Sequence, residues 1–216
     1  TLGRYRLEAL VGEGAMGQVW RARDPQLDRA VAIKVVHPSI AAGPDGGPRL
    51  LREARAMAKL SHPNVVTVYD AGDDAGRLFV AMDLVVGTTL GEWLRGRDGV
   101  RDWRAALARF RDAGRGLAAA HAAGVLHRDF KPDNVLIDRA GRVCVADFGL
   151  AAFGQKLEPT RQTSRADEQV VSDLTAAGTV LGTPAFMSPE QLRGEVIDAR
   201  ADQFSYCASL YEALYG

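Results

Sequence analysis

The spacing of apolar residues changes near residue 87, and this change restricts the folds open to the chain. Before it, apolar and polar residues alternate at 5–11, 18–23 and 30–36, as they do in half-buried strands. We expect two more strands at 65–69 and 78–85, a helix at 49–60, and a glycine- and proline-rich loop at 41–48. The opening part of the chain is therefore predicted to be β-rich.

After residue 87 the spacing becomes helical. One stripe on a long helix ending at Gly124 consists of Trp103, Leu107, Phe110, Gly114, Leu117 and His121. A two-stranded ribbon is expected at 135–137 and 143–145, and a long exposed loop at 150–181. A final, mostly buried helix is expected from Phe204, Cys207, Ala208, Tyr211 and Leu214. We predict an α+β fold with a β-rich lobe at 1–86 and a mainly helical lobe at 87–216.

Composition excludes several classes of partner. The formal net charge is zero, which gives no support to a nucleic-acid surface or a polybasic membrane anchor. No run approaches 18 consecutive apolar residues, so no membrane segment is expected in this chain. The two cysteines, Cys144 and Cys207, are too few for a disulfide framework and fit a reducing, cytoplasmic setting, although a longer parent protein could be tethered to a membrane.

Two short runs carry the groups that phosphoryl transfer needs. His127-Arg128-Asp129-Phe130-Lys131-Pro132-Asp133-Asn134 puts an acid, a lysine and an amide on one tight loop, and Asp147-Phe148-Gly149 follows a strand-like stretch at 142–146. Transfer from a nucleotide requires a carboxylate to receive a hydroxyl proton, oxygen ligands for Mg²⁺, and cations against the developing charge. The two runs contain all three.

A third motif lies near the start of the chain, at Gly12-Glu13-Gly14-Ala15-Met16-Gly17-Gln18-Val19. Glycines in this GxGxxGxV spacing let backbone N–H groups approach phosphate oxygens closely. A dinucleotide-binding turn uses the same glycines but is followed by a helix, whereas the residues after Gly17 alternate like a strand. We expect a hairpin that closes over phosphates. A plain glycine-rich hairpin remains the alternative.

Lys34 lies in the otherwise apolar stretch Val31-Ala32-Ile33-Lys34-Val35. Burying an ammonium is costly unless it is paired. Glu53 is the expected partner because it lies four residues before Met57 on the apolar side of the next helix. Asp45 is nearer in sequence but falls in the glycine- and proline-rich loop, and Glu53 could instead be an ordinary surface glutamate.

Two further motifs are Gly182-Thr183-Pro184 and Ser188-Pro189-Glu190. In residue types and in order along the chain, all these motifs resemble those of the catalytic domain of eukaryotic-type protein serine/threonine kinases, and most closely those of its bacterial members. The resemblance covers essentially the whole chain. It implies ATP and Mg²⁺ as cofactors, a protein as substrate, and a two-lobe kinase fold. A homodimer for autophosphorylation is a further expectation.

The resemblance also implies roles for individual residues. Asp129 would be the base, with Lys131 and Thr183 as its catalytic neighbours, and Asn134 and Asp147 would bind Mg²⁺. Lys34 would hold the α- and β-phosphates and Glu53 would hold Lys34. Met82 would guard the back of the adenine pocket, and backbone groups of Asp83 and Val85 would bond the adenine edge. The full cofactor-binding set is Val11, Gly12, Gly14, Gly17, Val19, Ala32, Lys34, Glu53, Met82, Asp83, Val85 and Leu136.

Further implications concern the supports of the site and its regulation. His127 would pack under Phe148 rather than act as a base, and Asp202 would brace the catalytic-loop backbone. Thr175 and Thr179 are candidates for phosphorylation, and the side chain of Arg128 would bind the phosphate group. Domains of this family continue with further helices, so we expect a truncated domain of low stability and weak activity.

Two other functions are less consistent with these motifs. A nucleotide-binding pseudokinase usually lacks the equivalent of Lys34, Asp129 or Asp147, and all three are present. A small-molecule kinase is disfavoured by the long segment that ends in Ser188-Pro189-Glu190.

Overall fold

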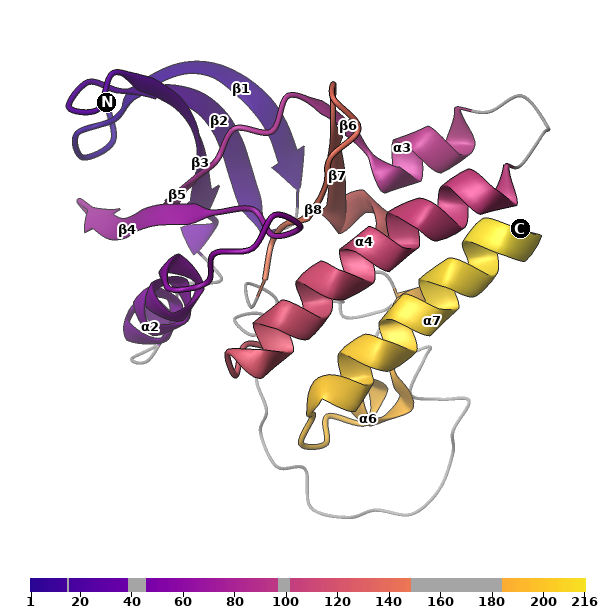
Figure 1. Ribbon diagram of the computed structural model, residues 1–216. Coiled ribbons are helices and arrows are strands. Elements are labelled where there is room, and N and C mark those ends of the chain that lie inside the picture. The colour runs from indigo at the N-terminus through magenta and orange to yellow at the C-terminus, as the bar shows by residue number, and fades with distance from the viewer. Residues whose placement is uncertain (15, 39–45, 97–101, 149–183) are drawn as a thin grey trace.

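The computed structural model describes residues 1–14, 16–38, 46–96, 102–148 and 184–216, and places a sheet-based part beside a helical part (Figure 1). The elements of the first part are β1 (Arg6–Gly14), β2 (Gly17–Asp24), β3 (Arg29–Val36), α2 (Gly46–Ala58), β4 (Val68–Asp74) and β5 (Arg77–Met82). Those of the second are β6 (Gly87–Thr89), α3 (Leu90–Arg95), α4 (Trp103–Ala122), η1 (Pro132–Asn134), β7 (Val135–Asp138), β8 (Val143–Val145), η3 (Pro184–Phe186), α6 (Pro189–Leu192) and α7 (Ala199–Tyr215). The predicted α+β class is confirmed.

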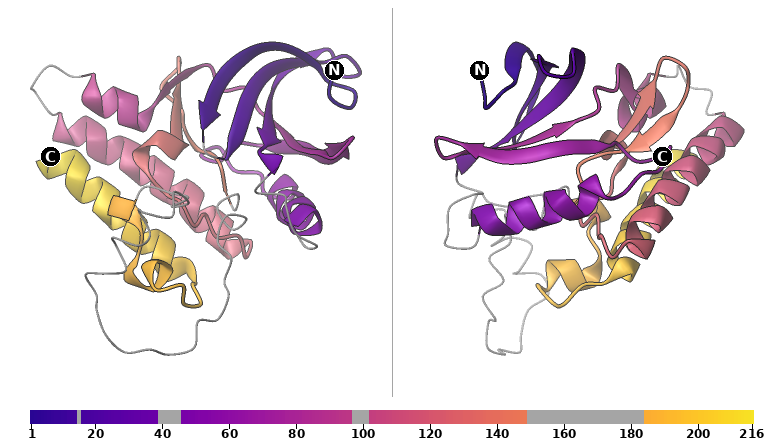
Figure 2. Two further views of the ribbon diagram at one scale, coloured as in Figure 1. Left: turned by 180° about the vertical axis from the view of Figure 1, so that it is seen from behind. Right: turned by 60° about the vertical axis from the view of Figure 1, so that its left-hand side comes forward.

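The first five strands form one antiparallel sheet in the order β1-β2-β3-β5-β4. Successive side chains of a strand point to opposite faces. Ile33 and Phe79 accordingly join Tyr5 in an apolar cluster on one face. Their neighbours in sequence, Ala32 and Val80, join Ala54 of α2 in a cluster on the other face. Helix α2 lies along this second face (Figure 2), so the sheet separates two apolar layers.

Several predicted boundaries were wrong, including those of α2, β4 and β5. Helix α2 begins at Gly46, so residues 46–48 belong to the helix rather than to the predicted loop. Proline is tolerated in a first helical turn because the N–H groups there have no partner within the helix. Strand β4 begins at Val68 rather than at residue 65, and β5 ends at Met82 rather than at 85. Val65 instead forms an isolated parallel bridge with Val145.

The predicted ribbon at 135–145 is in fact a three-stranded sheet in the order β6-β7-β8. Strand β6 is not predicted from the sequence, because a strand of three residues is too short to show alternation. This small sheet is tied to the segment after α2, since the Val66 N–H donates to the carbonyl of Val145 at 2.9 Å and the Val145 N–H donates to that of Asn64 at 2.9 Å.

The long helix α4 forms where it was predicted, with its C-cap at Ala123 just before Gly124. Its buried face overlaps the predicted stripe only in part, because Phe110 and Leu117 are buried whereas Trp103 is 48% exposed. Small residues share the buried face. A Cβ at Gly116 would overlap the carbonyl oxygen of Asn64, so only glycine permits this close approach.

Helix α7 lies beside α4 in both views (Figures 1 and 2), but the face predicted to be buried is largely exposed. Phe204 is 43% exposed and Tyr211 is 67% exposed. The buried residues of this helix are Ala201, Asp202, Ser205, Ser209 and Ala213. Short side chains let the helix approach its neighbours closely, and the Asp202 carboxylate accepts hydrogen bonds from the backbone of His127 and Arg128 in the loop before η1.

Candidate active site

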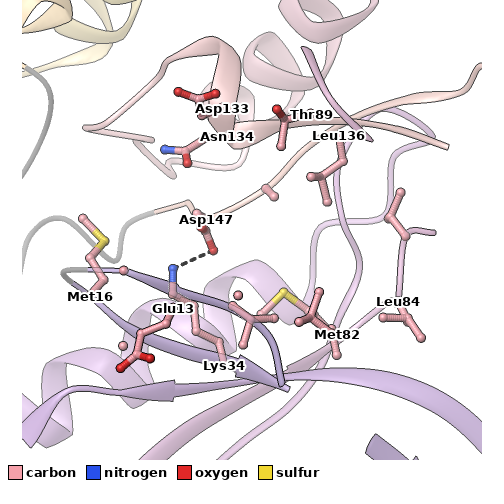
Figure 3. Close-up of a pocket in the computed structure, with 18 of the residues that line it drawn as sticks. Glu13, Met16, Lys34, Met82, Leu84, Thr89, Asp133, Asn134, Leu136 and Asp147 are labelled. Carbon is pink, nitrogen blue, oxygen red and sulfur yellow. Dashed lines mark ion pairs between the residues drawn. The ribbon is translucent and has the colours of Figure 1, made fainter. Parts of the chain in front are cut away.

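A cavity of about 600 Å³ lies between the five-stranded sheet and the loop that precedes β7 (Figure 3). This volume is in the range of small-molecule sites. The residues of the predicted site that line it are Val11, Gly12, Gly14, Gly17, Val19, Ala32, Lys34, Met82, Asp83, Val85, Asp129, Lys131, Asn134, Leu136 and Asp147. Glu53 lines a smaller adjoining cavity behind Met82. Thr183, Thr175 and Thr179 and the loop predicted at 150–181 lie outside the described residues.

The glycine motif joins β1 to β2 as a hairpin, with Gly12 opposite Val19 and Gly14 opposite Gly17. A strand, not a helix, follows the glycines, so the dinucleotide-binding turn is excluded. Gly17 has φ +135°, and a Cβ there would overlap the carbonyl oxygen of Val35. At Gly12 and Gly14 a Cβ would meet nothing within 4 Å, so their bare backbone faces open space at the cavity.

The far end of the cavity is an apolar slot. Leu136 of β7 and Met82 at the end of β5 lie on opposite sides of it (Figure 3). Val19 of β2 and Ala32 of β3 also line the cavity and belong to the same apolar cluster. The residue after Met82, Asp83, donates its N–H to the carbonyl of Thr67 at 2.9 Å. That N–H is already engaged, so the carbonyl of Asp83 and the backbone of Val85 are the groups that a planar ring in the slot could reach.

Lys34 pairs with Asp147, whereas the sequence predicts Glu53 as its partner. Its Nζ lies 2.8 Å from the Asp147 carboxylate, and the lysine side chain is only 6% exposed (Figure 3). Glu53 instead contacts the guanidinium of Arg128 at 3.0 Å. A buried ammonium needs a carboxylate partner, and the sequence cannot show which of two available carboxylates folds next to it.

This pairing sets the charge of Asp147. Burial disfavours its ionised form, but the positive charge of Lys34 and the hydrogen bond from it outweigh that effect and lower the pKa of Asp147. Asp147 also has φ +61°, a left-handed conformation that non-glycine residues seldom adopt. The carboxylate is therefore ionised at neutral pH and held in the cavity.

Asp129 is contacted by two polar side chains of its own loop. Lys131 Nζ lies 3.1 Å from the carboxylate. Asn134 Nδ2 donates to the same carboxylate at 3.1 Å and to the Asp129 carbonyl at 2.7 Å. Because the nitrogen of the Asn134 amide is used in this way, its oxygen remains for another partner.

His127 supports this loop from beneath. It is fully buried, its Nε2 lies 2.9 Å from the carbonyl oxygen of Ala146, and its ring lies 4.8 Å from that of Phe148. Burial lowers the pKa of His127. The predicted packing under Phe148 is therefore confirmed.

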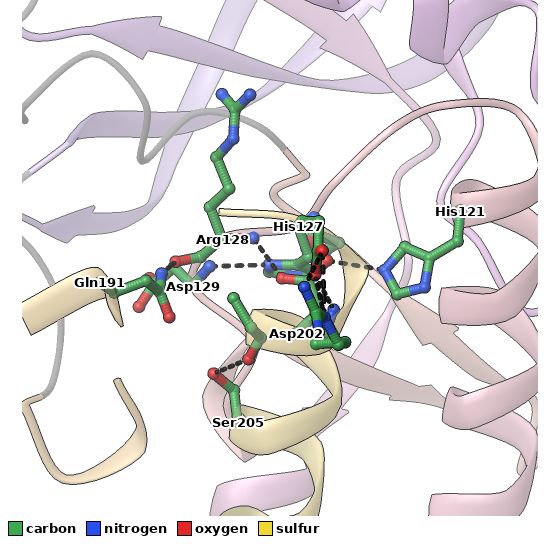
Figure 4. Close-up of polar contacts among 11 residues, drawn as sticks. His121, His127, Arg128, Asp129, Gln191, Asp202 and Ser205 are labelled. Carbon is green, nitrogen blue, oxygen red and sulfur yellow. Dashed lines mark hydrogen bonds and ion pairs between the residues drawn. The ribbon is translucent and has the colours of Figure 1, made fainter. Parts of the chain in front are cut away.

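Asp202 of α7 braces the catalytic loop, as predicted (Figure 4). Its carboxylate accepts from the N–H of His127 at 2.7 Å and from the N–H of Arg128 at 2.6 Å. Two contacts were missed. His121 Nε2 lies 2.7 Å from Asp202, and Gln191 Nε2 donates to the carbonyl of Arg128 at 2.8 Å. The apolar spacing of α4 predicts only a place for His121 on its stripe, and no spacing rule connects Gln191 to a loop 63 positions away.

Comparison with known proteins places this site in a family. The sequence matches the protein kinase domain over residues 5–216. This chain belongs to the protein kinase family. It is 42% identical to the DNA damage-responsive serine/threonine-protein kinase RqkA of Deinococcus radiodurans over 99% of its own length and 30% of that protein. It is 38% identical to the serine/threonine-protein kinase PknA of Mycobacterium tuberculosis over 99% of its length and 47% of that protein.

The fold agrees with this assignment. The crystal structure of the Mycobacterium tuberculosis PknI kinase domain aligns with a TM-score of 0.77 at 28% identity, covering 99% of this chain and 75% of that one. This chain spans 30% of the length of RqkA and 47% of the length of PknA. Among the described residues, no helix is both long enough and apolar enough to cross a membrane.

Proposed function

We propose that this chain is an ATP-dependent protein kinase that transfers the γ-phosphoryl group to serine or threonine hydroxyls of proteins. The observation that supports it best is the meeting of Lys34, Asp129, Lys131, Asn134 and Asp147 at one cavity that also has an apolar slot. The relatives reported above are named as serine/threonine-protein kinases, which supports the choice of acceptor.

The cavity has a suitable donor set for a nucleotide and its metal ion. The carboxylate of Asp147 and the free amide oxygen of Asn134 are hard ligands of the kind that Mg²⁺ prefers. A bound Mg²⁺ would offset the negative charge of the phosphates. Lys34, at the same place, would contact the phosphates from the sheet side, while the slot formed by Val19, Ala32 and Leu136 would enclose the adenine.

The proton is handled by Asp129. Its carboxylate would accept the proton of the substrate hydroxyl and orient the oxygen toward the γ-phosphorus. Lys131, 3.1 Å from this carboxylate, would offset negative charge that develops on the transferred group. The contacts from Lys131 and Asn134 hold the base in place before substrate arrives, so little reorganisation is needed during transfer.

We assign residues 1–86 to the first lobe and 87–216 to the second, with the adenine slot at their junction. We also propose that the protein autophosphorylates as a homodimer. We further propose that it works in the cytoplasm, either free or on the cytoplasmic face of a membrane. The reducing setting suggested by the cysteine content supports the location.

A transfer assay tests the proposal. The chain is incubated with radiolabelled ATP, Mg²⁺ and a generic basic protein, and label on serine and threonine is separated from label on other residues. We expect Mg²⁺-dependent label on serine or threonine that is lost in Asp129→Asn. Nucleotide binding with no transfer above the Asp129→Asn level would instead indicate a pseudokinase.

A further inference from the structure

Gln191 in the short helix α6 contacts the main chain of the catalytic loop (Figure 4). Its Nε2 donates to the carbonyl oxygen of Arg128 at 2.8 Å, and the residue as a whole is only 5% exposed. Arg128 is the residue immediately before Asp129, the proposed base. The bond therefore reaches the peptide that leads into the base, from an element that lies far along the chain.

The chemistry of its neighbours determines which way the amide of Gln191 points. On one side the N–H of Ser188 donates to Gln191 Oε1 at 3.1 Å, and the Ser188 hydroxyl donates to the same oxygen at 3.2 Å. On the other side is a carbonyl oxygen, which can only accept. The amide oxygen must therefore face Ser188 and the amide nitrogen must face Arg128.

Arg128 needs such support because its backbone is in an unfavourable conformation. Its φ is +68°, in the left-handed region that a residue with a Cβ occupies at a cost. Its N–H donates to Asp202 Oδ1 at 2.6 Å, while its carbonyl accepts from Gln191. The two polar groups of this residue's main chain are thus held from two different helices, α7 and α6.

We propose that Gln191 is a positioning residue that sets the orientation of Asp129 through the Arg128 carbonyl. This inference rests on the proposed kinase function. It assigns to Gln191 a role in the rate of transfer in addition to its place in the Ser188–Gln191 cap of α6.

The substitution Gln191→Glu separates the two roles. A glutamate keeps the oxygen that caps Ser188, and glutamate is itself favoured at this position of a capping box. It replaces the donor that faces Arg128 by a carboxylate oxygen, which would repel the carbonyl. Because small misplacements of catalytic groups can cost about 10²-fold in rate, we expect kcat to fall by roughly 10- to 100-fold. The KM for ATP and the melting temperature should stay close to those of the wild type.

A pH profile gives a signature that a purely structural role would not produce. Protonation of the new carboxyl restores a donor toward Arg128, so the ratio of mutant to wild-type kcat should rise as the pH is lowered from about 9 to about 6, toward the carboxyl pKa range. Gln191→Leu has no such group and should show a low kcat without recovery. Gln26→Glu, which makes the same change of charge in an exposed turn, is the matched control and should behave as the wild type.

Amide hydrogen exchange of the peptide spanning residues 127–134 provides a readout that does not depend on activity. We expect faster exchange there in Gln191→Glu and unchanged exchange in α4.

If the wild type and Gln26→Glu transfer no phosphate, the proposed kinase function fails. In that case the exchange measurement alone tests the role of Gln191, and unchanged exchange at 127–134 in Gln191→Glu overturns that role. If they are active, a kcat within about twofold of wild type for both Gln191 variants overturns it. A parallel loss of ATP affinity, melting temperature and kcat would also overturn it.

Discussion

The ammonium of Lys34 in β3 lies 2.8 Å from the carboxylate of Asp147, which follows β8, so the pair joins the five-stranded sheet to the three-stranded one across the cavity. The second carboxylate of the region, that of Glu53, contacts Arg128 at 3.0 Å. Each of these two acidic residues therefore has a basic residue of a different segment beside it.

Replacing Lys34 removes a cation from the phosphate end of the cavity and leaves the apolar slot intact. Lys34→Met should therefore lower the rate of transfer strongly while a nucleoside without phosphates binds as in the wild type. Lys59→Met, at an exposed position after α2, is the matched control. Calorimetric titration with adenosine and with ATP measures the two contributions. Equal weakening of adenosine and ATP binding would contradict the assignment of Lys34 to the phosphates.

Removing the carboxylate of Asp147 should abolish the Mg²⁺ dependence of nucleotide binding. Asp147→Ala deletes a charged oxygen ligand, and an amide alone holds Mg²⁺ poorly. Titration with ATP in the presence and absence of Mg²⁺ measures the difference, with Asp112→Ala, at a partly exposed position of α4 that does not line the cavity, as control. A metal dependence that persists unchanged in Asp147→Ala would show that the metal is held elsewhere.

The role of Asp129 as a base predicts loss of rate without loss of binding. Asp129→Asn keeps the shape of the side chain but cannot accept a proton in the same way. Transfer should fall by roughly 10² to 10⁴, the contribution of a positioned general base, while ATP affinity stays nearly the same. Steady-state kinetics and equilibrium binding check the two quantities. If binding fell as far as turnover, Asp129 would be part of the nucleotide site instead.

Two glycines of the hairpin should respond differently to alanine. Gly17→Ala puts a Cβ onto the carbonyl oxygen of Val35 at φ +135°, so it should destabilise the fold by about 1–3 kcal/mol. Gly12→Ala meets nothing within 4 Å and should leave stability unchanged while raising the KM for ATP. Denaturant unfolding and kinetics distinguish the pair. Equal stability of the two variants would argue against the strain assigned to Gly17.

The buried state of His127 predicts how stability depends on pH. Because burial lowers its pKa in the folded chain, the unfolded chain binds more protons below the ordinary histidine pKa, and stability rises with pH there. The melting temperature should therefore fall as the pH is lowered through about 6.5. His127→Phe should be less stable but have a flatter pH profile, whereas His37→Gln, at an exposed position, should retain the wild-type slope.

The glycine hairpin, the apolar strand around Lys34 and the acid, lysine and amide of the catalytic loop could be found from the sequence. Each is a local pattern whose chemistry depends on neighbours within a few positions. The helix α4 was predicted for the same reason, since its period is repeated over several turns. The short strand β6 and the first residues of α2 could not be found, because one turn or three residues carry too little periodicity.

The side chains available to phosphate, metal ion and proton can be identified from the sequence, because their types and spacing are local. Which of them meet depends on the tertiary fold. It paired Lys34 with Asp147 rather than Glu53, buried the small face of α7 rather than its aromatic one, and brought Gln191 to Arg128. These outcomes depend on how helices and sheets pack. Packing brings together residues that can be more than 60 positions apart in the sequence, and the free-energy cost of burying polar groups then decides which of them pair.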